Sequence, residues 1–325
     1  MRFFKANLFL KTILLICCTG FLLQADAQPS GTSTPPKDFF LKGTVTTSKD
    51  SADSGDKSTI STGVGAFIAT TNTNAKYNKA NMLYYGMIDS LSKMIFRYPV
   101  MDSAGLPYAE EWVGTPNMGL RRPNYVIIHF TANNNCDETL REFTTTGGRE
   151  ASAHYVISKD GTVYHMLNDL LRAHHAGESK WGNTTDINSS SVGIELDNNG
   201  TQPFTEVQMN SLLTLLARLK AAYKIPTANF IGHGDVAPTR RSDPGTKFPW
   251  KQLSEQGYGL WWDDTTGVQV PDNFDYLIGL RIIGYDISNP AAALAAFKRH
   301  FMGDNSGTMN ADIRRIIYVL YQKYL

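Results

Sequence analysis

Four polar side chains that lie far apart in the chain are candidates for a joint chemical role: His129, Glu195, His233 and Asp243. Two imidazole nitrogens and one carboxylate oxygen are a common catalytic zinc set, in which three protein ligands leave the fourth position open. We therefore predict that His129, His233 and Asp243 bind one zinc ion. Glu195 then remains as a carboxylate that can act as general base and general acid.

Three of these residues lie near the ends of apolar, strand-like runs. The runs are "NYVIIHFTA" with His129, "VGIEL" with Glu195 and "NFIGH" with His233. In open α/β sheets, ligands bind outside the carboxyl ends of the strands. We expect the three runs to bring their polar residues to one rim of a sheet.

The segments between these runs predict the rest of the sheet. "FTEVQMNSLLTLLARLKAAYKIP" has apolar residues on one helical face, and Thr205 and Gln208 have capping-box spacing at its start. Strand, helix and strand then form a βαβ unit with parallel strands. Asp160-Gly161 predicts a hairpin between "AHYVIS" and "TVYHM". The expected fold class is α/β, with a mixed central sheet flanked by helices. The apolar helix positions are Met209, Leu212, Leu213, Leu216, Leu219 and Tyr223.

The loop "IGHGDVAPTRRSDPG" supports a catalytic rather than a structural metal site. Pro244-Gly245 turns the chain directly after Asp243, and Asp235 is placed to orient the loop that follows His233. Structural zinc sites use mostly Cys, and only Cys136 lies beyond the N-terminal apolar run. Taken singly, each polar residue has a simpler explanation as a core, surface or turn residue. Their joint occurrence favours the metal site.

Composition and the N-terminus indicate an exported globular protein. The 325 residues are 42% hydrophobic, and Lys plus Arg (31) balance Asp plus Glu (30), which gives no basic footprint for nucleic acid. Residues 1–27 have a basic start, an apolar run and an Ala-Asp-Ala site, as in a signal peptide. An uncleaved anchor and a lipoprotein modified at Cys17 or Cys18 are the alternatives. We expect a periplasmic or secreted bacterial protein with no transmembrane helix after cleavage.

The remaining segments divide the chain. Residues 28–64 are rich in Ser, Thr, Gly, Pro and Asp and predict a flexible linker. Residues 65–122 form an N-terminal extension of unknown role, with one helix expected at 81–96. Residues 272–325 predict three short helices, with Asn289-Pro290 and Asn310 at helix starts.

Residues 123–262 resemble the zinc-dependent N-acetylmuramoyl-L-alanine amidases of the type-2 amidase family, relatives of the peptidoglycan recognition proteins. The matching blocks include "VIIHFTA", "SAHYVISKDGTVY", "HHAGESKWG", "NSSSVGIEL" and "GHGDVAPTRRSDPGTKFPW". The resemblance implies zinc ligation by the three residues named above, catalysis by Glu195, and a substrate-binding place for His175. Arg241 stands where catalytic members usually carry Lys. It can stabilise an oxyanion but cannot donate a proton.

The resemblance implies hydrolysis of the amide between N-acetylmuramic acid and L-alanine, in peptidoglycan or muropeptides. The alternatives are a recognition protein without catalysis and a zinc amidase for another amide. Residues 272–325 resemble a small three-helix peptidoglycan-binding module. A helical extension that only packs on the amidase domain is the alternative.

Overall fold

The computed structural model describes residues 76–95, 117, 119–148 and 150–325 of the chain. The predicted signal peptide (1–27), the predicted linker (28–64) and most of the extension (65–122) lie outside the described residues. Within the extension, α1 (Asn78–Ile95) confirms the expected helix, and none of its residues is buried. No helix in the described ranges combines the length and the apolar character needed to cross a membrane.

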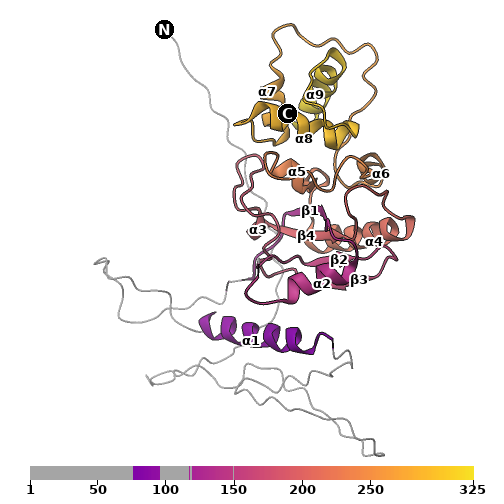
Figure 1. Ribbon diagram of the computed structural model, residues 1–325. Coiled ribbons are helices and arrows are strands. Elements are labelled where there is room, and N and C mark those ends of the chain that lie inside the picture. The colour runs from indigo at the N-terminus through magenta and orange to yellow at the C-terminus, as the bar shows by residue number, and fades with distance from the viewer. Residues whose placement is uncertain (1–75, 96–116, 118, 149) are drawn as a thin grey trace, which may run out of the picture. The chain divides into compact units, whose positions relative to one another are not determined.

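A five-stranded mixed sheet forms the centre of the fold, in the order β3-β2-β4-β1-β5 (Figure 1). β1 runs parallel to both β4 and β5, and β2 runs parallel to β4. β3 is antiparallel to β2, which confirms the hairpin. β1 lies between the two strands of the predicted βαβ unit, so these are parallel but not neighbours. The strands are β1 (Tyr125–Phe130), β2 (Tyr155–Ile157), β3 (Val163–His165), β4 (Ser191–Leu196) and β5 (Phe230–Gly232).

Helix α4 (Glu206–Tyr223) covers one face of the sheet. Its buried Leu212 and Leu216 share a core with Val126 and Ile128 of β1, which point to the same face because side chains alternate along a strand. Thr205 caps the helix by accepting a hydrogen bond from the Gln208 backbone at 3.2 Å. The reciprocal half of the expected capping box is absent, because the Gln208 amide donates to the carbonyls of Ile157 and Asp197.

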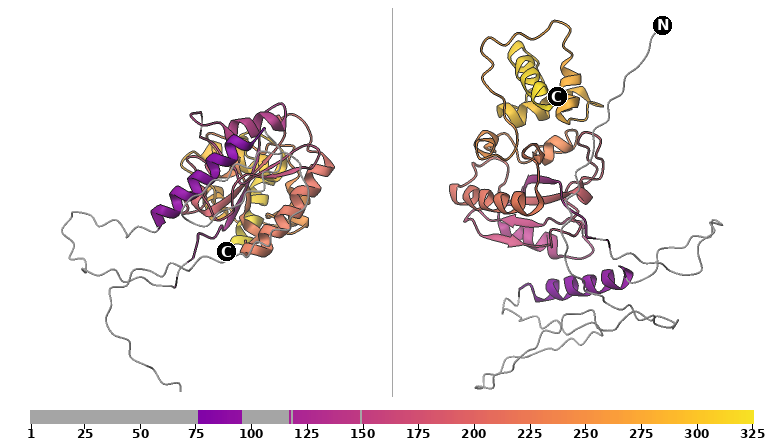
Figure 2. Two further views of the ribbon diagram at one scale, coloured as in Figure 1. Left: turned by 90° about the horizontal axis from the view of Figure 1, so that it is seen from below. Right: turned by 180° about the vertical axis from the view of Figure 1, so that it is seen from behind.

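The other face carries the C-terminal helices, α7 (Tyr276–Ile283), α8 (Pro290–Met302) and α9 (Ala311–Tyr324), as predicted. Asn289 and Asn310 cap α8 and α9. Ile127 of β1 belongs to the same core as the apolar residues of these helices. Figures 1 and 2 show them next to α5 (His233–Val236) and α6 (Trp250–Glu255).

The C-terminal helices therefore share a hydrophobic core with the sheet. Trp181, Ile231 and Val236 lie in one cluster with Tyr285 and Phe297. The described residues from 76 onward belong to one compact unit. The C-terminal helices are therefore packed against the part of the chain that carries the sheet. Shorter helices connect the strands: α2 (Cys136–Thr144) follows β1, α3 (Ile187–Ser190) leads into β4, and the 3₁₀ turn Thr227–Asn229 leads into β5.

Candidate active site

Strand register brings His129 and Glu195 together. The two residues are direct partners across the parallel pair β1 and β4. Both lie on the face opposite α4, because they alternate with Ile128 and Ile194 of that core. The Glu195 Oε1 atom is 4.0 Å from His129 Nδ1. The expected meeting of these strand ends is therefore observed.

Two backbone hydrogen bonds place the other two residues. His233 is the first residue of α5 rather than the last of β5, one position beyond the expected strand end. The amide of Gly234 in α5 donates to the Asp243 carbonyl at 2.7 Å, which connects α5 to the loop that carries Arg240, Arg241 and Asp243. The amide of Gly245 donates to Ser242 at 2.9 Å and closes the turn expected at Pro244-Gly245.

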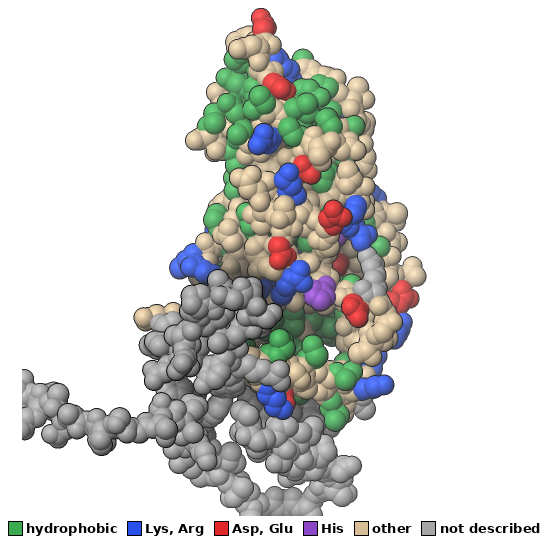
Figure 3. Space-filling view, turned by 90° about the vertical axis from the view of Figure 1, so that its left-hand side faces the viewer, with side chains coloured by type: hydrophobic (Ala, Val, Ile, Leu, Met, Phe, Trp, Pro, Cys, Tyr) green, Lys and Arg blue, Asp and Glu red, His purple; other side chains and the backbone are tan. Residues whose placement is uncertain are grey.

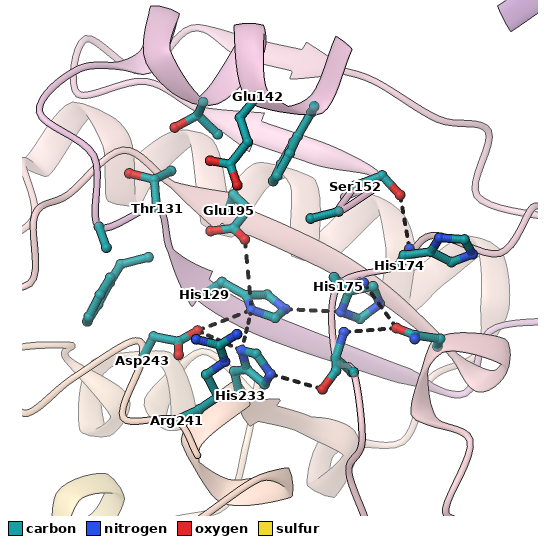
Figure 4. A pocket seen from close by; sticks show the side chains of 18 of the residues that line it. His129, Thr131, Glu142, Ser152, His174, His175, Glu195, His233, Arg241 and Asp243 are labelled. Carbon is teal, nitrogen blue, oxygen red and sulfur yellow. Dashed lines mark hydrogen bonds and ion pairs between the residues drawn. The ribbon is translucent and has the colours of Figure 1, made fainter. Parts of the chain in front are cut away.

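The donor atoms of His129, His233 and Asp243 converge on one point (Figure 4). The two Nδ1 atoms are 3.0 Å apart. Asp243 Oδ2 lies 3.1 Å from His129 Nδ1 and 3.0 Å from His233 Nδ1. Tetrahedral zinc with ligand bonds of about 2.0–2.1 Å separates its donor atoms by about 3.3 Å. These spacings fit a small tetrahedral cation.

The protonation of the cluster also fits a cation. Burial, and secondarily the nearby His233, lower the pKa of His129 to about 4. Burial raises the pKa of the Asp243 carboxyl, but hydrogen bonds with His129 and His233 outweigh this and hold it well below its usual range. Neutral imidazoles and a carboxylate are the forms that bind metals.

The far nitrogens of both histidines are held by protein groups. His129 Nε2 lies 3.0 Å from His175 Nδ1, and His233 Nε2 lies 3.1 Å from the carbonyl oxygen of Ala176. Since these contacts take up the Nε2 atoms, both Nδ1 lone pairs face the cluster. Such partners fix the tautomer and ring direction of metal-binding histidines.

His175 makes contacts inside the protein, and its expected contact with substrate stays a prediction. Its Nδ1 contacts His129, and its Nε2 lies 3.0 Å from the Ser191 hydroxyl. The ring fits because a Cβ on Gly193 would lie only 2.5 Å from it. His175 still lines the cavity, but its ring nitrogens contact protein. The glycine in "VGIEL" was the available signal for this packing.

The paired arginines have different surroundings. Arg240 donates to the carbonyls of Ala176 at 2.9 Å and Glu178 at 3.0 Å, so it holds the segment after His175. Arg241 points its guanidinium toward Asp243 and the histidines (Figure 4). The family resemblance singled out Arg241, but the role of Arg240 became visible only in the folded loop.

The cluster opens into a cavity of about 570 Å³. On the face in Figure 3, histidine, acidic and basic side chains gather near a hollow, and hydrophobic side chains gather over the C-terminal helices. α2 and the segment around Ser152 form one wall of the cavity, and the sequence predicted no role for the residues of this wall. The lining side chains on this wall include Thr139, Glu142, Phe143, Glu150, Ser152 and His174.

A mixed α/β sheet carries two histidines, an aspartate and a glutamate around one open cavity, and the histidines and the aspartate could hold a metal ion. Comparison with known proteins identifies the family. Residues 119–246 match the family model for N-acetylmuramoyl-L-alanine amidase. The amidase AmiD of Escherichia coli K12 is 30% identical over 235 residues, covering 62% of this chain and 84% of AmiD. The chain belongs to the type-2 N-acetylmuramoyl-L-alanine amidase family.

Further relatives and solved structures agree. The 1,6-anhydro-N-acetylmuramyl-L-alanine amidase AmpD of Enterobacter cloacae is 37% identical over 102 residues, covering 31% of this chain and 54% of AmpD. E. coli AmiD in complex with an anhydro-N-acetylmuramic acid peptide has a TM-score of 0.57 at 29% identity, covering 65% of this chain and 93% of AmiD. Pseudomonas aeruginosa AmpDh3 has a TM-score of 0.58 at 29% identity, covering 70% of this chain and 99% of AmpDh3. These likenesses confirm the resemblance and the mixed α/β fold.

Proposed function

We propose that this protein is a zinc hydrolase that cleaves the amide between N-acetylmuramic acid and L-alanine. The convergence of His129, His233 and Asp243 beside Glu195, in a chain of this family, carries the proposal. The substrates are peptidoglycan or the muropeptides derived from it. Relatives named for anhydro-muropeptides, and AmiD in complex with one, support this substrate class.

The three buried donors would hold one zinc ion and leave one position facing the cavity. Bound zinc would lower the pKa of a coordinated water toward about 7 and polarise a carbonyl. Asp243 balances part of the cationic charge. The contacts of His175 and Ala176 keep both imidazoles in the tautomer that the ion needs.

Glu195 would carry the proton through the reaction. Its carboxylate accepts a proton from the attacking water, whose oxygen bonds to the carbonyl carbon. The same carboxyl then delivers that proton to the alanine nitrogen as the carbon–nitrogen bond breaks. The products are a carboxylate on the lactyl group and a peptide with a free L-alanine amine. Arg241 stabilises the negative charge that develops on the carbonyl oxygen.

Location and the C-terminal helices complete the proposal. The N-terminal sequence supports export to the periplasm or beyond. The resemblance of residues 272–325 to a peptidoglycan-binding module supports a contribution to wall binding. Their shared core with the sheet supports a packing role in addition.

Zinc removal and restoration test the proposed function. The purified protein is incubated with a soluble disaccharide-peptide, first as isolated, then with a chelator, then with zinc restored. We expect amide cleavage that the chelator abolishes and one equivalent of zinc restores. Zinc binding without cleavage would point to a recognition protein. Cleavage that survives complete zinc removal would contradict the zinc mechanism.

A further inference from the structure

The buried carboxylate of Asp235 connects the C-terminal helices to α5, the helix that begins with His233. Asp235 lies in α5, two residues after His233, and only 3% of it is exposed. Its Oδ2 accepts a hydrogen bond from the Gly232 backbone at 2.8 Å. This bond closes the turn between β5 and α5, which sets the direction in which His233 leaves the sheet.

The remaining contacts of this carboxylate come from the C-terminal helices and the segment between them. The hydroxyl of Tyr285 donates to Asp235 Oδ1 at 2.9 Å. Nδ1 of His300, in α8, lies 2.7 Å from Oδ2. Tyr285 and His300 are both buried. Since a buried carboxylate is costly unless it is hydrogen-bonded, these contacts hold Asp235 in its place.

Helix α8 also packs on α6 and on the start of α5. The His300 ring stacks on Trp250 with centroids 4.0 Å apart and planes 10° apart. A Cβ on Gly234 would lie 2.7 Å from Arg299 Nη1, so α8 closes tightly over the start of α5. The amide of Gly234 in turn bonds the Asp243 carbonyl. α8 therefore packs directly on the segment of His233, and the loop of Asp243 is bonded to that same segment.

We propose that Tyr285 and His300 are positioning residues of the metal centre. Through Asp235 they fix the direction of His233, and this makes residues 272–325 a built-in part of the active site as well as a surface for wall binding. The inference rests on the proposed zinc site. Partners of this kind are typically worth about 10- to 100-fold in metal affinity or activity.

Point variants of the full-length protein separate positioning from packing. Tyr285→Phe removes one hydroxyl, and His300→Phe keeps an aromatic ring on Trp250 while removing the Nδ1 donor. His300→Asn places an amide nitrogen near the position of Nδ1 and serves as the rescue variant. Ile317→Val removes one methyl group from the same hydrophobic core without changing a hydrogen-bond partner of Asp235, and controls for loss of stability. Each variant is assayed for zinc affinity against a competing chelator, for the visible spectrum of the cobalt-substituted protein, and for the apo-protein melting temperature.

We expect His300→Phe to weaken zinc binding about 10- to 100-fold and to shift the absorption bands of the cobalt-substituted protein. Tyr285→Phe should also weaken zinc binding. His300→Asn should recover part of the affinity. Ile317→Val should lower the melting temperature and leave zinc affinity and the cobalt spectrum unchanged. Wild-type zinc affinity and spectrum in both Phe variants would overturn the positioning role. A wild-type protein that binds no zinc would instead overturn the proposed function on which this inference rests.

Discussion

His129 Nε2 and His175 Nδ1 lie 3.0 Å apart in the buried interior behind the cavity. His175 continues to Ser191, whose hydroxyl lies 3.0 Å from Nε2 and donates to the Ile187 carbonyl at 2.6 Å. Because the Ser191 proton is used there, its oxygen accepts from His175, and His175 Nδ1 accepts from His129. The chain of hydrogen bonds leaves a lone pair on Nδ1 of His129, which faces His233 and Asp243.

Replacement of His175 tests this relay. We expect His175→Ala to weaken zinc binding about 10- to 100-fold, because His129 loses the partner that fixes its tautomer. Ser191→Ala should cause a smaller loss, since it acts one step further away. Competition with a chelator measures both. A His175→Ala protein with normal zinc affinity and a raised KM would indicate the substrate contact that the sequence first suggested.

Gly193 provides the space for His175. An added Cβ would lie 2.5 Å from the imidazole, so Gly193→Ala should displace the ring, lower stability by about 1–3 kcal/mol and weaken zinc binding at least about tenfold. Gly119→Ala is the matched control, because nothing lies within 4 Å of its added Cβ. Urea unfolding and zinc titration of the two variants check this. Equal behaviour of the two would contradict the packing argument.

Glu195 carries the proton in the proposed reaction. We expect Glu195→Gln to lose about 10²- to 10⁴-fold in turnover, the usual contribution of general acid–base catalysis, while it keeps bound zinc. Metal analysis and kinetics on the same preparation separate these effects. Near-normal turnover of the Gln variant would remove Glu195 from the mechanism.

Arg241 is expected to act through its charge. Arg241→Ala should lower kcat about 10²- to 10³-fold with a smaller effect on KM, as for loss of an oxyanion donor. Arg241→Lys keeps a cation and should retain most activity. Arg240→Ala is an informative comparison, because that side chain donates to backbone carbonyls. If Arg241→Lys were as impaired as Arg241→Ala, charge alone would not explain the role.

Asp169 makes stability depend on acid pH. Burial raises the pKa of its carboxyl, but hydrogen bonds from Tyr155 and Tyr223 and the charge of Arg218 outweigh this and lower it. A lowered folded-state pKa stabilises the fold above the unfolded pKa of about 3.9 and loses that contribution as pH falls through the folded value.

The matching variant is Asp169→Asn. It should lower the free energy of unfolding by about 1–3 kcal/mol at pH 7 and by less near pH 3. Urea unfolding at both pH values gives the difference. An equal loss at both would show that the charge of Asp169 does not contribute.

Much of the site was predictable because its residues follow strand patterns. "NYVIIHFTA" and "VGIEL" are apolar runs typical of buried strands, so the meeting of His129 and Glu195 at one rim followed from parallel pairing, and the structure confirms it. The resemblance to the family supported the prediction that Asp243, in the loop after His233, belongs to the same site. Zinc binding and the individual catalytic roles remain predictions.

Other features depended on tertiary packing. The Gln208 side chain donates to the carbonyls of Ile157 in β2 and Asp197 after β4 instead of completing a capping box, because a buried amide finds partners that spacing alone does not show. The insertion of β1 between β4 and β5 has no local signal. Asp235 is bonded to Tyr285 and His300, which lie 50 and 65 positions further along the chain. The periodicity of helices and strands predicts only local neighbours, so it could not predict these contacts.

The most direct test of the central claim identifies the broken bond and the source of the oxygen. The zinc-loaded protein is given a soluble disaccharide-peptide in oxygen-18 water, and the products are analysed by mass spectrometry. We predict an unlabelled peptide that begins at L-alanine and one oxygen-18 atom on the lactyl carboxylate of the sugar fragment. Cleavage at another bond, or no cleavage by protein that holds one zinc ion, would contradict the account.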